Sequence, residues 1–112
     1  MEFIELYSKD GLSYFKDVKV AGQSSQVLGL YSAPYPVKSM QFRASEGVEQ
    51  FDWHPAPRSQ YIVYLSGKVE IVASGGETRI FKAGDVLFAN DTEGKGHISK
   101  ILVKSRALVL VA

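Results

Sequence analysis

Short runs of β-branched and aromatic residues, separated by turn residues, recur along the whole chain. A new run begins every ~8 to 12 residues, which is typical of the strands of a β-sandwich or barrel. No amphipathic helix of useful length interrupts them, so the pattern predicts an all-β fold. We expect strands over residues 3–7, 14–20, 37–44, 60–65, 68–73, 77–81, 86–89, 97–103 and 107–111, with a further short strand near 27–31.

Glycine-containing turns lie between these runs. Ser74-Gly75-Gly76 is the clearest hairpin signal, because glycine adopts the positive φ that tight turns need. We expect further turns at Ser66-Gly67 and at Ala83-Gly84-Asp85, and a polar loop over residues 90–96.

Alternation divides the side chains of a strand between its two faces. Gln60, Ile62 and Tyr64 share one face, so if Gln60 points into a barrel, Tyr64 offers a phenol deeper inside. The opposite face is also apolar and needs cover, which a second sheet or a partner chain can provide; we expect a homodimer. That face carries Tyr61, Val63 and Leu65. In the run 37–44, alternation likewise places Met40 and Phe42 on one face and Gln41 and Arg43 on the other.

Composition limits the class of protein. No composition shift divides the 112 residues, and 46% hydrophobic residues supply one core, so we expect a single domain over residues 1–112. The 13 basic and 12 acidic residues are scattered, which argues against a nucleic-acid or membrane partner. No run approaches the ~20 apolar residues of a membrane span, and acidic residues stand where a signal peptide would be basic. We expect a cytoplasmic protein; without cysteine it has neither disulfides nor thiolate metal sites.

Two segments carry a family resemblance. Residues 60–67, which end in Leu65-Ser66-Gly67, and residues 81–88, which contain Gly84-Asp85-Val86-Leu87, resemble the core of the cupin superfamily. The resemblance extends from Asp52 to about His97. It implies a small, single-domain, RmlC-like jelly-roll barrel, also called a double-stranded β-helix, with its motif-bearing core over about 37–112. The strands and loop of residues 1–36 would then pack on the barrel or on a dimer partner.

The metal motif of this family is reduced here. His54 matches the first of its histidines, whereas Ala56 stands in place of the second and Gln60 in place of the glutamate. The last histidine, His97, comes about two residues late. The resemblance thus implies three metal ligands, His54, Gln60 and His97, in a weak site for one divalent transition metal (iron, zinc, nickel, copper or manganese). The alternative is a vestigial pair of histidines, hydrogen-bonded across the mouth of the barrel to Gln60 or Tyr64.

Five further residues are candidates for ligand binding, each with a structural alternative. Tyr64 is either a hydroxyl donor or simply part of the core. Arg58 can bind a carboxylate bidentately or brace its strand beside Pro57, and Trp53 is more typical of packing or a dimer contact. Asp91 and Glu93 lie in a loop that can act as a rim over the pocket or as an ordinary solvated turn.

Three functions remain open, because the cupin fold hosts many unrelated activities. The first is a metal-dependent isomerase, lyase or dioxygenase acting on a small polar substrate. The second is a metal-free, non-catalytic module that binds a small molecule in the same pocket. The third is a scaffold whose barrel serves only for dimerisation.

Overall fold

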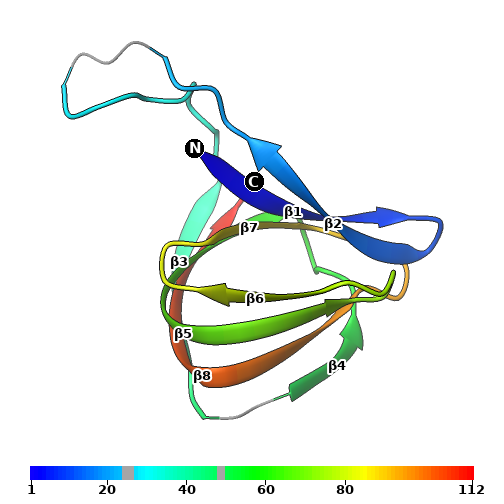
Figure 1. The fold of residues 1–112 in the computed structure, drawn as a ribbon. Coiled ribbons are helices and arrows are strands. Elements are labelled where there is room, and N and C mark those ends of the chain that lie inside the picture. The colour runs from blue at the N-terminus through cyan, green and yellow to red at the C-terminus, as the bar shows by residue number, and fades with distance from the viewer. Residues whose placement is uncertain (24–26, 48–49) are drawn as a thin grey trace.

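The computed structural model describes residues 1–23, 27–47 and 50–112, and these ranges form strands but no helix. Consequently, no helix in the described ranges is long and apolar enough to cross a membrane. Within these ranges, eight strands follow one another (Figure 1). They are β1 (Glu2–Lys9), β2 (Leu12–Lys19), β3 (Ser39–Ser45), β4 (Gln50–His54), β5 (Gln60–Ala73), β6 (Thr78–Lys82), β7 (Val86–Asn90) and β8 (His97–Val111).

The strands form one mixed sheet that curls around a single interior (Figure 1). Its order is β2-β1-β7-β5-β8-β3, with β4 added on β8 and β6 on β5. β1 and β7 are parallel, and the other pairs are antiparallel. β5 and β8 pair along almost their whole length, from Gln60 opposite Val111 to Ala73 opposite His97. The jelly-roll fold expected from the sequence is therefore confirmed.

Alternation along β5 sorts its side chains as predicted. Ile62 and Tyr64 are buried inside, whereas Leu65 on the opposite face is exposed. Tyr64 stacks on Phe81 with ring centroids 5.2 Å apart. The remaining core residues are mostly aliphatic and come from strands all around the roll; they include Leu6, Val69, Ile71, Leu87, Ile101, Ala107 and Val109.

The predicted turn at Ser66-Gly67 is wrong, because β5 continues through it. The pairing with β8 shifts register around Ser66 and Lys68, so the glycine lies at a bulge. Gly67 has a φ of 81°, and a Cβ added there would collide with the backbone of Lys104 and Ser105. Glycine is thus needed for close approach to β8 rather than for chain reversal. The two predicted strands over 97–103 and 107–111 are likewise one strand, β8.

Two other expectations about strands also differ from the structure. The short strand expected near residues 27–31 is absent, and Tyr31 forms only an isolated bridge to Gln23. Conversely, β4 was not expected, because its five residues, Gln-Phe-Asp-Trp-His, do not alternate cleanly. A register shift between Phe51 and His54 accounts for that irregularity.

Candidate functional site

A cavity of about 280 Å³ lies inside the barrel. Apolar residues from β5, β7 and β8 form much of its wall, among them Ile62, Leu87 and Ile101. Its polar lining consists of Arg43, Ser45, His54, Gln60, Tyr64, His97 and Ser99. Four residues singled out from the sequence, His54, Gln60, Tyr64 and His97, therefore line one cavity. No carboxylate is among the described residues that line it.

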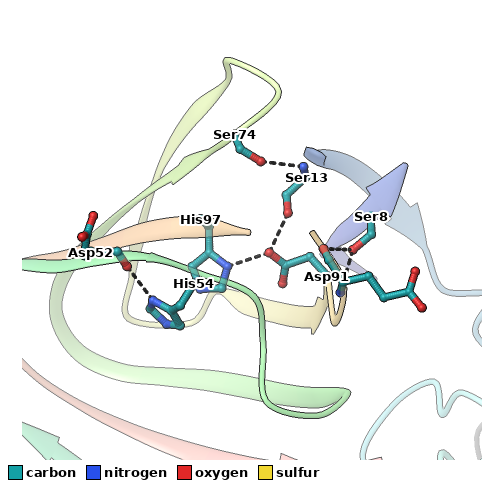
Figure 2. Close-up of polar contacts among 8 residues, drawn as sticks. Ser8, Ser13, Asp52, His54, Ser74, Asp91 and His97 are labelled. Atoms are coloured by element: carbon teal, nitrogen blue, oxygen red, sulfur yellow. Dashed lines mark hydrogen bonds and ion pairs between the residues drawn. The ribbon is translucent and has the colours of Figure 1, made fainter. Parts of the chain in front are cut away.

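The pairing of β4 with β8 brings the two histidines together. His54 lies opposite His97, and their ring centroids are 4.8 Å apart at an interplanar angle of 53°. Gly96 permits this approach, since a Cβ at that position would collide with the backbone of His54. The His54 Nδ1 lies 2.7 Å from the backbone oxygen of Asp52 (Figure 2). A carbonyl oxygen only accepts, so this Nδ1 carries the hydrogen and Nε2 is left free.

His97 is held by a buried carboxylate. Asp91 is completely buried, and its Oδ2 lies 2.6 Å from the His97 Nδ1 (Figure 2). The same oxygen accepts a hydrogen bond of 2.8 Å from the Ser13 hydroxyl. Because an ionised carboxylate accepts from both groups, His97 also keeps its Nε2 free, on a side chain that lines the cavity. Asp91 Oδ1 has no hydrogen-bond partner among the described residues, which makes these two bonds to Oδ2 more important.

Three separate segments fix Asp91 in this position. The Ser13 amide donates to the Ser74 hydroxyl at 2.8 Å, which ties the start of β2 to the turn between β5 and β6. The Ala56 amide donates to the Asp91 carbonyl at 2.9 Å. Ser13 was not foreseen from the sequence, and no local pattern marks it, because it is 78 residues away from Asp91.

Tyr64 and Arg43 form the inner part of the site. Tyr64 is 1% exposed, and burial raises the pKa of its phenol to about 12, with the nearby Arg43 guanidinium opposing the rise only in part. The phenol therefore remains a hydrogen-bond donor throughout the neutral range. None of the ion pairs in the described part of the chain includes Arg43. The sequence shows that Arg43 and Phe42 point to opposite faces of the strand. It does not show which of these two side chains points into the interior.

Four residues singled out from the sequence do not line the cavity. One is Asp91, which is buried behind His97 rather than placed on a rim or in a solvated turn. Trp53 is half-buried, with the Lys95 Nζ 4.5 Å from its ring centroid. Arg58 is exposed, and its Nη2 lies 3.5 Å from the Gln41 Oε1. Glu93 is also exposed, and its backbone exchanges hydrogen bonds with the Ser8 hydroxyl.

A comparison with protein families agrees with this fold. The family model described as the EutQ-like cupin domain matches residues 42–104, which is more than half of the chain. The chain belongs to the cupins. The matched part of this cupin runs from β3 into β8 and so includes both histidines of the cavity. Among curated proteins, none matches the chain.

The donor set of this cupin does not fit a tightly bound divalent metal. Two imidazoles and the neutral amide of Gln60 line the cavity, whereas the Asp91 carboxylate is engaged with Nδ1 of the His97 ring. Arg43 adds a fixed positive charge to the same cavity, which opposes a second cation. The described residues contain no group of three or more histidine, cysteine, aspartate or glutamate side chains able to hold a metal ion.

Proposed function

We propose that this cupin binds a small carboxylate-bearing molecule in its barrel cavity without a resident metal. The observation that supports this function is the charge of the lining: the Arg43 guanidinium faces the cavity, and no carboxylate among the described residues does. The positive charge of this lining attracts an anion and repels a metal cation. The volume of about 280 Å³ suits a ligand of about ten non-hydrogen atoms.

The lining assigns a part of the ligand to each group. The guanidinium of Arg43 binds the carboxylate bidentately, and the Tyr64 hydroxyl donates a hydrogen bond beside it. Gln60 and the two histidines bind polar groups at the other end of the ligand. The aliphatic wall, which includes Ile62 and Leu87, covers its carbon chain.

Calorimetric titration of tag-free protein tests this function. The probes are acetate, lactate, malonate and succinate, each compared with its neutral amide. We expect at least one acid to bind and its amide to bind at least tenfold more weakly, because the amide cannot form the charged pair with Arg43. Equal binding of acid and amide would count against the proposal.

A matched pair of arginine variants locates the binding. Arg43→Gln removes the cavity guanidinium and is expected to weaken binding about 10- to 100-fold, since a hydrogen bond to a charged group contributes about 1.5–3 kcal/mol. Arg58→Gln removes an arginine that does not line the cavity and should leave affinity unchanged. Equal effects of the two variants would place the ligand elsewhere.

A second candidate function is removal of a proton from the carbon atom next to the carboxylate of the bound ligand. The Asp91–His97 pair favours it, because a carboxylate on Nδ1 orients an imidazole whose Nε2 can accept a proton. Proton NMR in deuterium oxide tests it, with the best-binding acid of the panel as the probe. Loss of the signal from the hydrogens next to its carboxylate, abolished by His97→Gln, would support turnover. Retention of that signal leaves binding as the function.

A further inference from the structure

The polar groups that line the cavity differ in the hydrogen bonds that they form. Arg43 donates only, because a guanidinium has no acceptor, and the raised pKa of Tyr64 keeps the proton on its hydroxyl. Gln60, Ser45 and Ser99 each carry a donor and an acceptor, so these three side chains do not select between a donating and an accepting ligand. Selection between the two therefore depends on the histidines.

Both histidines are held in the same tautomer. The His54 Nδ1 donates to the Asp52 carbonyl at 2.7 Å, and the His97 Nδ1 donates to the Asp91 carboxylate at 2.6 Å (Figure 2). Neither a carbonyl oxygen nor an ionised carboxylate has a hydrogen to offer, so Nδ1 is the protonated nitrogen of each neutral ring. Nε2 of each ring is then an acceptor, and no hydrogen bond among the described residues occupies it.

Strand pairing separates the donors of the cavity from these acceptors. Arg43 and Tyr64 are both cross-strand partners of Ala107 on β8. His54 is the partner of His97, which lies ten positions away on the same strand (107 − 97). All four polar side chains nevertheless line one cavity. The cavity thus has a donor end and an acceptor end.

We propose that the ligand of this cavity is a hydroxy acid, whose carboxylate lies at Arg43 and whose hydroxyl donates a hydrogen bond to Nε2 of His97. This inference rests on the proposed carboxylate binding and specifies the other end of the ligand. A hydroxyl fits better than an ammonium group, because the positive charge of Arg43 in the same cavity opposes a second cation. An ether or ketone oxygen does not fit, because it only accepts and would face another acceptor.

His97 contributes more to this selection than His54. His97 is 7% exposed, so its Nε2 has little access to water when a ligand without a donor fills the cavity. A buried acceptor that is left unpaired weakens binding. His54 is exposed, and water replaces the ligand hydroxyl there. Binding of a hydroxy acid should therefore depend strongly on His97 and only weakly on His54.

Calorimetric titration of wild-type protein with acids that differ in the donor tests the proposal. The hydroxy acids are 3-hydroxypropionate and 4-hydroxybutyrate, and each is compared with its own methyl ether, 3-methoxypropionate or 4-methoxybutyrate. Each is also compared with an isomeric ether of the same size, methoxyacetate or 3-methoxypropionate. We expect one hydroxy acid to bind at least tenfold more tightly than both of its ethers, because the ethers leave Nε2 of His97 unpaired.

A matched pair of histidine variants locates the selection. His97→Phe keeps an aromatic ring but removes Nε2, and should reduce the preference for the hydroxy acid over its ethers to less than about threefold. His54→Phe should retain the preference. Far-UV circular dichroism establishes that the strands of each variant are intact. If His97→Phe loses that signal, long-range ¹H–¹⁵N NMR of the wild-type imidazoles decides, since both rings should carry hydrogen on Nδ1 and none on Nε2.

Three outcomes would overturn the inference. They are ethers that bind as tightly as the hydroxy acids, a preference that persists in folded His97→Phe, and a hydrogen on Nε2 of His97 under the conditions of the titration. Each is distinct from failure of the proposed function, in which acids and their neutral amides bind equally. Ethers that equal the hydroxy acids but still bind more tightly than the amides would remove only the hydroxyl from the proposal.

Discussion

His54 at the end of β4 and His97 at the start of β8 lie directly opposite each other, with ring centroids 4.8 Å apart. The hydrogen-bond partners that orient the two rings differ. A backbone carbonyl orients the exposed ring of His54, whereas a buried carboxylate orients the buried ring of His97. Each support engages Nδ1 and leaves Nε2 free. The pair thus combines one buried and one exposed imidazole in the lining of the same cavity.

Replacing Asp91 tests how far the fold depends on the support of His97. Asp91→Ala should lower the free energy of unfolding by about 3–5 kcal/mol, because it leaves the buried partners of the carboxylate without a hydrogen bond. Urea denaturation measures this loss. Glu93→Ala is the control, since its side chain is exposed in the same loop, and it should change stability by less than ~0.5 kcal/mol. A similar small loss for Asp91→Ala would show that the buried pair contributes little.

Much of the fold could be predicted from the sequence because its signals are local. The β5–β6 hairpin follows from Ser74-Gly75-Gly76, and alternation correctly placed Ile62 and Tyr64 on one face. The cupin resemblance likewise rests on contiguous residues, and it assigned His54 and His97 to one site although 43 positions separate them in the chain (97 − 54). Periodicity and turn chemistry are both properties of a short window, so a single sequence contains them.

The parts of the site that were missed depend on contacts between distant segments. Asp91 was expected on a rim or in a solvated turn, yet it is buried with Ser13, which comes from the other end of the chain. Arg43 was overlooked because the apolar residues beside it, Met40 and Phe42, would ordinarily face the interior. Here the polar face of β3 lines the cavity, and its apolar face lies on the outer surface of the barrel. Alternation alone does not reveal which face of a strand is inside.

Tyr64 predicts a loss of stability in alkali. Burial raises the pKa of its phenol to about 12 from the ordinary value of 10. A group whose pKa is raised by folding contributes stability that is complete below the unfolded pKa and lost as the pH rises through the folded pKa. The Tyr64 contribution should therefore be present below pH ~10 and fall by about 3 kcal/mol between pH ~10 and ~12.

Denaturation of wild type and Tyr64→Phe at several alkaline pH values measures this contribution. The stability of wild type relative to Tyr64→Phe should fall across that window, because phenylalanine does not titrate. Tyr31→Phe, which removes an exposed tyrosine, should keep the pH dependence of wild type. Parallel profiles for wild type and Tyr64→Phe would contradict the burial of an un-ionised phenol.

Metal analysis follows from the donor set of the cavity. Protein purified without a histidine tag should contain iron, zinc, nickel, copper and manganese at well below one ion per chain. Removing a metal that binds only the folded state would lower the melting temperature. Because we expect no resident metal, adding a chelator should leave the melting temperature unchanged. One equivalent of a metal that is lost together with His54→Ala would contradict the metal-free proposal.

Two glycine variants separate close packing from backbone conformation. Gly67 and Gly84 both have a positive φ, 81° and 93°, so alanine at either position costs about 1–2 kcal/mol of backbone strain. A Cβ at Gly84 would meet no atom within 4 Å, whereas one at Gly67 would collide with the backbone of Lys104 and Ser105. Gly67→Ala should therefore lower the free energy of unfolding by clearly more than Gly84→Ala in the same urea titration. Equal losses would mean that β5 and β8 can separate at the bulge without cost, and that the glycine is needed there only for its φ.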